Sequence, residues 1–169
     1  MPTHGKVGYV SANHNAVEDY VAFAVSTIDC RLDGMKIAVD CANGASYETA
    51  FKALNKLGAN VEAIHNTPDG VNINHMCGST HMESLQAYVT SIGADIGIAF
   101  DGDADRMLAV DENGNLIDGD QIMAACAKFM RDNGTLKQNT LVATVMSNLG
   151  LFMAGEKIGI NIPRTKVGD

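Results

Sequence analysis

Hydrophobic and polar positions follow two alternating patterns along this chain. Short apolar runs, typical of buried strands, occupy residues 36–42, 61–65, 94–100, 106–110, 141–146 and 161–167. Between them lie segments with apolar residues at helical spacing, at 16–28, 47–57, 82–92, 118–130 and 147–156. The alternation predicts an α/β fold of three-layer type, in which helices flank a mixed, mostly parallel sheet.

Turn and cap residues between these segments give the elements their expected ends. The Asn113-Gly114 pair predicts an antiparallel hairpin that joins residues 106–110 to 115–117. Gly58 is expected to end the preceding helix in a left-handed conformation. The expected N-caps are Asn43 or Ser46 for the helix at 47–57, Ser79 or Thr80 for 82–92, and Asp118 or Asp120 for 118–130.

Composition narrows the class of protein. With 169 residues, of which 46% are hydrophobic, the chain is long enough for one ordinary domain and part of another. The net charge of −8 argues against a nucleic-acid partner, which would require a basic face. No apolar run is long enough for a membrane span, and no signal-peptide pattern opens the chain, so no membrane partner is expected.

Cysteine usage indicates a reducing compartment. The four cysteines, at positions 30, 41, 77 and 126, form no Cys-x-x-Cys pair. Cys41 and Cys126 lie in apolar runs, where a buried free thiol is expected. We therefore expect reduced thiols and a cytoplasmic location.

The most informative stretch is an acidic loop between two predicted strands. Asp101, Asp103 and Asp105 alternate with small residues, and Arg106 follows directly. Three ionised carboxylates this close repel one another, and a divalent cation held by their oxygens removes that cost. The spacing therefore predicts a metal site at the edge of a sheet.

Three interpretations of this loop compete. A solvated acidic turn would explain the carboxylates but not their regular spacing. An EF-hand loop would place Glu112 at its twelfth position, but Arg106 stands where that loop normally has Gly, and the flanking segments are predicted strands. A magnesium site for phosphoryl transfer also explains Arg106, which would bind a phosphate beside the metal.

The loop Phe100-Asp101-Gly102-Asp103-Ala104-Asp105-Arg106 resembles the metal-binding loop of the α-D-phosphohexomutases. Further segments resemble the bacterial phosphoglucosamine mutase branch of that family: residues 40–45, 68–74, 78–81, 118–123, 144–150 and 165–169. The resemblance covers about residues 32–169 and implies three parts. These are a linker with a leading helix (1–31), the family's second domain (32–138) and the start of its third domain, an incomplete βαβ unit (139–169).

The resemblance implies an Mg²⁺-dependent isomerase of amino-sugar metabolism that interconverts glucosamine 6-phosphate and glucosamine 1-phosphate, through a phosphoserine and a bisphosphate intermediate. Asp101, Asp103 and Asp105 would bind Mg²⁺, Arg106 would contact the phosphoryl group, and Lys166 would bind phosphate or move a proton. A phosphosugar would be the substrate, and the family's domains 1, 3 and 4 would be needed to complete the enzyme.

The family's phosphoserine loop has no convincing counterpart in these residues. The stretch 10–15 is superficially similar, but Asn13 stands at the position of the reactive serine. We therefore expect this chain alone to be inactive and to bind Mg²⁺ weakly. The alternatives are another phosphohexomutase (a phosphomannomutase or phosphoglucomutase), a phosphatase with an Asp nucleophile, and a non-catalytic metal-binding domain.

Overall fold

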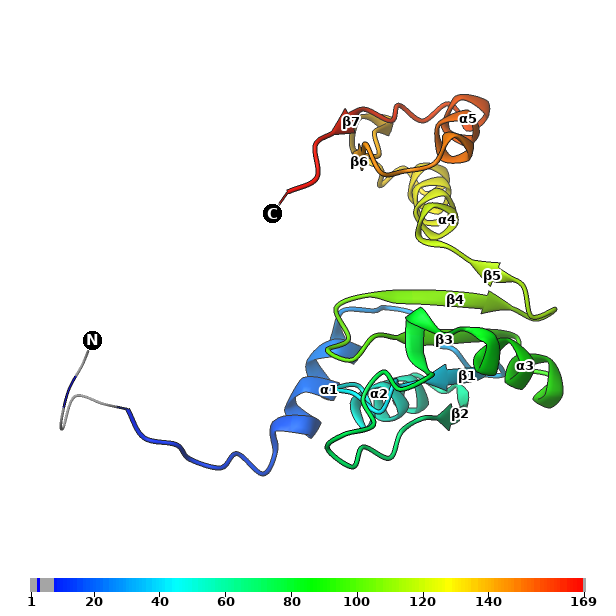
Figure 1. The fold of residues 1–169 in the computed structure, drawn as a ribbon. Helices are drawn as coiled ribbons and strands as arrows, with labels where there is room; N and C mark the ends of the chain where they lie inside the picture. The colour runs from blue at the N-terminus through cyan, green and yellow to red at the C-terminus, as the bar shows by residue number, and fades with distance from the viewer. Residues whose placement is uncertain (1–2, 4–7, 169) are drawn as a thin grey trace.

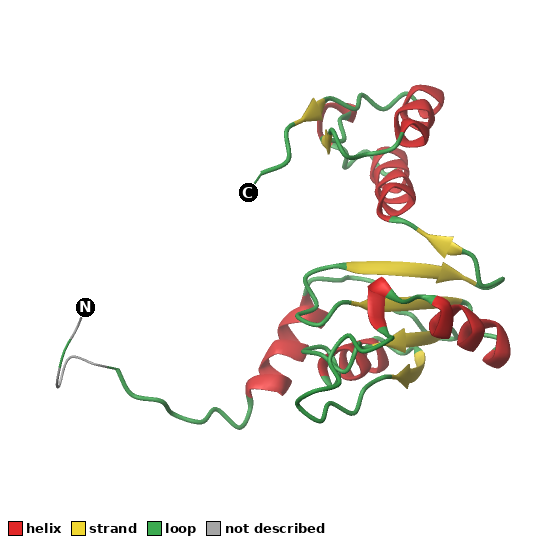
Figure 2. Ribbon diagram, viewed as in Figure 1, coloured by secondary structure: helices red, strands yellow, loops and turns green. Residues whose placement is uncertain are grey.

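The computed structural model describes residue 3 and residues 8–168. Part of the predicted linker (residues 1, 2 and 4–7) and the final residue, 169, lie outside the described residues. The helices and strands, drawn in Figures 1 and 2, are α1 (Ala16–Ser26), β1 (Lys36–Asp40), α2 (Thr49–Lys56), β2 (Asn60–Ile64), η2 (Gly78–Thr80), α3 (Glu83–Ile92), β3 (Ile96–Phe100), β4 (Met107–Asp111), β5 (Leu116–Ile117), α4 (Gly119–Asp132), η3 (Lys137–Asn139), β6 (Ala143–Thr144), α5 (Leu149–Ile158) and β7 (Arg164–Thr165).

A five-stranded sheet in the order β2-β1-β3-β4-β5 forms the centre of the larger body. Strands β1, β2 and β3 run parallel, and β4 and β5 add two antiparallel pairings at one edge. The predicted mixed sheet with flanking helices is therefore confirmed. The hairpin expected at Asn113-Gly114 is also confirmed, because β4 and β5 pair across it.

Alternate residues of the strands build a separate core on each face of the sheet. On one face, Ala38, Ala99 and Val110 pack against Leu85 and Val89 of α3. On the other face, buried residues of β1 and β2 such as Val39 and Val61 pack with Ala50 and Leu54 around α2. Helix α1 packs on α2. The parallel strands are thus covered on both faces, which is the arrangement expected for βα units.

The N-cap predicted from the sequence is confirmed for one of three helices. Asp118 caps α4 in a capping box, since its side chain accepts from the Gln121 amide and the Gln121 side chain accepts from the Asp118 amide. The caps expected for α2 were wrong, because that helix begins after Glu48 and has no side-chain cap. Those expected for α3 were also wrong, because residues 79 and 80 form a short 3-10 turn and the α-helix starts only after Met82.

A smaller body follows the hairpin. Helix α4 leads from β5 away from the sheet (Figure 1) and packs on α5, beside the parallel pair β6-β7. The strands predicted at 141–146 and 161–167 contain only two ladder residues each. Cys126, predicted to be buried, is exposed on α4 because its helix face has no covering element among the described residues. The domain boundaries predicted at 31/32 and 138/139 stay a prediction.

None of the described helices has the length and apolar character that a membrane crossing requires.

Candidate metal centre

The acidic loop is the tight turn between β3 and β4. Strand β3 ends at Phe100 and β4 begins at Met107, so the antiparallel pairing of these two residues fixes both ends of the turn. Inside it, the amide of Ala104 donates to the Asp101 carbonyl at 3.1 Å, and Ala104 has a positive φ of 62°. This compact backbone brings the alternate side chains of the loop toward one another.

Asp101, Asp103 and Asp105 each offer one carboxylate oxygen, and these oxygens all lie within 4.8 Å of one another. Oxygens that share one Mg²⁺ at about 2.1 Å lie at most about 4.2 Å apart, so small side-chain rotations are enough for a common ion. Asp101 is buried, whereas Asp103 and Asp105 are exposed. The donor set fits a hard divalent cation that is held from one side and open on the other.

Arg106 lies against two of these carboxylates. Its backbone amide donates to Asp101 Oδ1 at 3.0 Å, and its guanidinium group lies 2.7 Å from Asp101 Oδ2 and 3.3 Å from Asp105 Oδ1. The arginine side chain is 76% exposed, so it is anchored at its tip while most of its surface faces solvent. A guanidinium group held in this way can turn from the carboxylates to an incoming phosphate.

The carboxylates of the loop repel one another, and Arg106 attracts Asp101. The negative charge of Asp105 raises the pKa of Asp103, and Asp101 adds to that effect. Burial by itself would raise the pKa of Asp101, but the hydrogen bonds from Arg106 outweigh it and lower that pKa. The repulsion that Asp103 feels is the cost that a bound cation would remove.

Close backbone contacts hold the loop on the turn that follows β1. The amide of Ala45 donates to the Gly102 carbonyl at 2.8 Å. A Cβ on Gly44 would lie 2.2 Å from that same carbonyl oxygen, and a Cβ on Gly102 would lie 2.6 Å from Asn74 Nδ2. Glycine is therefore required at position 44 to let two backbone segments meet, whereas an added Cβ on Gly102 would meet only the side chains of Asn74 and Ile73.

Gly44→Ala is accordingly expected to displace the acidic loop and to lower the free energy of unfolding by about 1–3 kcal/mol. Gly119→Ala is the matched control, because a Cβ there meets nothing within 4 Å. Urea unfolding of both variants measures the difference. Equal stability of the two variants would contradict the close-contact argument.

Not every predicted site residue lies at this turn. Lys166 follows β7 in the smaller body, is exposed, and makes no hydrogen bond or ion pair with residues 101–106.

The hollow beside Asp103 is a surface depression of about 340 Å³, which Tyr20 and Thr49 also line. A hollow of about 400 Å³ lies instead between α4 and α5, around Asp118 and Asn148. Within the described residues, the acidic loop is therefore open to solvent.

Sequence reasoning missed a second cluster, formed by Asp40, His65 and Cys77. Asp40 was treated as a strand residue and His65 as the end of a strand, whereas β2 ends at Ile64 and His65 has a positive φ of 48°. The available signal was Asp40 directly after the apolar run Ile37-Ala38-Val39, where a buried carboxylate needs polar partners.

Comparisons with known proteins agree with this fold. Residues 16–114 match the family model "Phosphoglucomutase/phosphomannomutase, alpha/beta/alpha domain II", and residues 118–169 match the model for alpha/beta/alpha domain III. A phosphoglucosamine mutase of Clostridium acetobutylicum is 57% identical over the whole chain, which spans 38% of that relative. A phosphoglucosamine mutase of Clostridium novyi is 58% identical over 99% of the chain and 37% of its own length.

Solved structures give the same result. A phosphoglucomutase/phosphomannomutase family protein from Burkholderia thailandensis superposes with a TM-score of 0.73 at 27% identity, covering 90% of this chain and 33% of the other. An N-acetylglucosamine-phosphate mutase of the alpha-D-phosphohexomutase superfamily shares the fold at a TM-score of 0.65 and 19% identity, over 92% of this chain and 37% of its own. The chain belongs to the phosphoglucomutase/phosphomannomutase family.

Proposed function

We propose that this chain supplies the metal-binding part of an Mg²⁺-dependent phosphoglucosamine mutase, which interconverts glucosamine 6-phosphate and glucosamine 1-phosphate. The observation that carries the proposal is the convergence of three carboxylates beside Arg106 in a chain that is 57% identical to a phosphoglucosamine mutase over its whole length. The chain spans less than two fifths of the length of such relatives, so the complete reaction needs groups from outside these residues.

In the proposed reaction, the carboxylate oxygens of Asp101, Asp103 and Asp105 would hold Mg²⁺. An ion held there would supply positive charge that offsets the negative charge of the transferring phosphoryl group. Arg106 then exchanges a carboxylate oxygen for a phosphate oxygen, which leaves its charge paired throughout. The close approach of Gly44 to the Gly102 backbone, together with the hydrogen bond from the Ala45 amide to the Gly102 carbonyl, would keep the carboxylates in place during this exchange.

Groups outside the acidic loop would complete the proposed reaction. A phosphoserine elsewhere in the enzyme would donate the phosphoryl group, and a bisphosphate would be the intermediate. Lys166, which is exposed at the end of β7, would contact phosphate or move a proton once the sugar lies between the two bodies. The cysteines at 30, 41, 77 and 126 are unpaired, which supports the proposed cytoplasmic location.

A chimeric enzyme tests the proposal. The matching 38% of the Clostridium acetobutylicum phosphoglucosamine mutase is replaced by this chain, and turnover of glucosamine 1-phosphate is measured in a coupled assay. We expect the chimera to be active with Mg²⁺ and inactive with a chelator. A chimera that folds but stays inactive at saturating Mg²⁺ would refute the assignment.

The 169-residue chain assayed alone is the companion measurement. We expect no turnover, because none of its residues matches the family's reactive serine. We also expect a Kd for Mg²⁺ above about 1 µM, because carboxylate sites for this ion usually recruit phosphate as well. Turnover of glucosamine phosphate by the chain alone would instead support an independent enzyme. Hydrolysis of a generic phosphate ester by the chain alone would support a phosphatase.

A further inference from the structure

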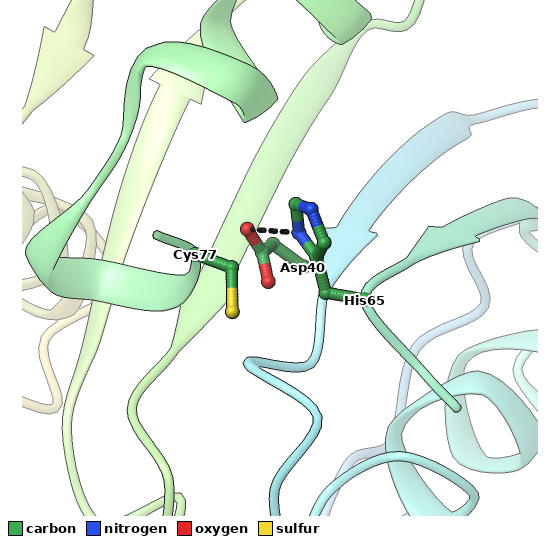
Figure 3. A group of neighbouring side chains, drawn as sticks. All are labelled: Asp40, His65 and Cys77. Atoms are coloured by element: carbon green, nitrogen blue, oxygen red, sulfur yellow. Dashed lines mark hydrogen bonds and ion pairs between the residues drawn. The ribbon is translucent and has the colours of Figure 1, made fainter. Parts of the chain in front are cut away.

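A second group of potential metal ligands lies outside the acidic loop and consists of Asp40, His65 and Cys77. Asp40 is the last residue of β1, His65 follows β2, and Cys77 precedes η2. One ligand atom from each residue lies within 4.8 Å of the other two. Figure 3 shows the Asp40 carboxylate between the Cys77 thiol and the His65 ring, so three segments far apart in the sequence meet here.

The Asp40 carboxylate is buried but retains capacity to bind. Its Oδ1 accepts from the Ala42 amide at 2.8 Å, and its Oδ2 accepts from the Gly78 amide at 2.9 Å and lies 2.9 Å from His65 Nδ1. Each carboxylate oxygen accepts about two hydrogen bonds or metal bonds, so Oδ1 keeps one acceptor site, and Oδ2 gains one when an ion takes the place of the direct contact with His65 Nδ1. The carboxylate is thereby oriented by the backbone and stays available to a cation.

The Cys77 thiol is placed for coordination rather than for attack on a substrate. Its residue is fully buried, and its sulfur has only a long contact of 3.9 Å with Asn43 Nδ2. A nucleophilic cysteine needs access to substrate and a stabilised thiolate, and this position provides neither. The His65 side chain, in contrast, is 31% exposed and gives the cluster its opening to solvent.

We propose that Asp40, His65 and Cys77 bind one thiophilic divalent transition metal of the Zn²⁺ type, with water as the fourth ligand. Thiolate, imidazole and carboxylate are the donors that such ions prefer, whereas Mg²⁺ selects oxygen alone. Tetrahedral bonds of about 2.0 Å place the nitrogen and oxygen ligands about 3.3 Å apart. The present distance between His65 Nδ1 and Asp40 Oδ2 is 2.9 Å, so a small widening accommodates the ion.

The bound ion would connect three segments next to the acidic loop. Asp40 pairs with Ala99 in the sheet, and a Cβ on Gly78 would lie 2.6 Å from the Phe100 carbonyl oxygen. Metal binding at this cluster therefore stabilises the native chain and raises its Tm by mass action. The inference uses none of residues 101–106 and is independent of the proposed mutase reaction.

Titration of the chelator-treated full chain with Co²⁺ tests the proposal. We expect one equivalent to give the visible bands of tetrahedral cobalt together with a thiolate-to-cobalt charge-transfer band, and Zn²⁺ to abolish both while excess Mg²⁺ leaves them. Cys77→Ser should remove the charge-transfer band, and His65→Gln should weaken Co²⁺ binding at least about tenfold. Cys126→Ser and Asp103→Asn are the controls, because both residues lie outside the cluster, and both variants should keep the band.

Should Cys77→Ser not fold, as judged by circular dichroism, the wild-type chain decides the question. Zn²⁺ should then protect Cys77 from alkylation during partial unfolding, read by peptide mass analysis. The proposal is overturned if wild-type chain gives no charge-transfer band, if the band survives in folded Cys77→Ser, or if Zn²⁺ gives Cys77 no protection.

Discussion

Replacing both Asp103 and Asp105 by Asn in the chimeric enzyme is expected to lower kcat at least about a thousandfold. The substitution keeps the size of the side chains and removes two of the three negative charges that would hold Mg²⁺. Because both residues are exposed and lie in a turn, the fold should remain intact. The coupled assay measures kcat at saturating substrate and at several Mg²⁺ concentrations.

Glu112→Gln is the matched control for that double variant. This exposed carboxylate lies in the β4–β5 turn, outside the acidic loop, and would be a ligand only if the loop were of EF-hand type. We expect it to leave kcat within about twofold of the parent chimera. Loss of activity in Glu112→Gln, or full activity in the double Asn variant, would favour a different site.

Asp40→Ala is expected to lower the free energy of unfolding of the metal-free chain by about 3 kcal/mol or more. The carboxylate is completely buried, and its loss leaves the amides of Ala42 and Gly78 without their acceptor. Urea unfolding in the presence of a chelator measures the effect, so that the structural contribution is separated from metal binding.

Asp95→Ala provides the comparison for Asp40→Ala. Asp95 also accepts from a backbone amide, that of Lys36 at 2.7 Å, but it is exposed and water can replace it. We expect a loss of about 1 kcal/mol or less for this variant. If Asp40→Ala destabilises the chain no more than Asp95→Ala, the buried carboxylate does not hold the loops in the way described above.

Local sequence patterns predicted the sheet and the acidic turn well. Strand β1 was predictable because Ile37, Ala38 and Val39 form a continuous apolar run, and such a run is recognised from adjacent residues alone. The same holds for the β4–β5 hairpin, whose turn chemistry is contained in two adjacent residues. The close approach of Asp101, Asp103 and Asp105 follows from their spacing within one short turn.

Features that depend on distant residues were not predictable in the same way. Asn43 was expected to cap a helix, but its side-chain carbonyl accepts from the Thr67 amide at 3.2 Å and so joins two loops. His65 meets Asp40 and Cys77 only because β2 pairs with β1 and residues 72–78 fold back over that edge. The guanidinium contacts of Arg106 also required coordinates, since sequence placed it beside the metal and phosphate but not against Asp101.

The most direct test of the central claim is a titration of the isotope-labelled chain with Mg²⁺, followed by the amide signals in NMR spectra. We expect saturable, weak binding with the largest shifts at residues 101–106, and loss of these shifts when Asp103 and Asp105 are both replaced by Asn. Shifts centred on another part of the chain, or an unchanged affinity in the double variant, would contradict the assignment of this loop as the magnesium site.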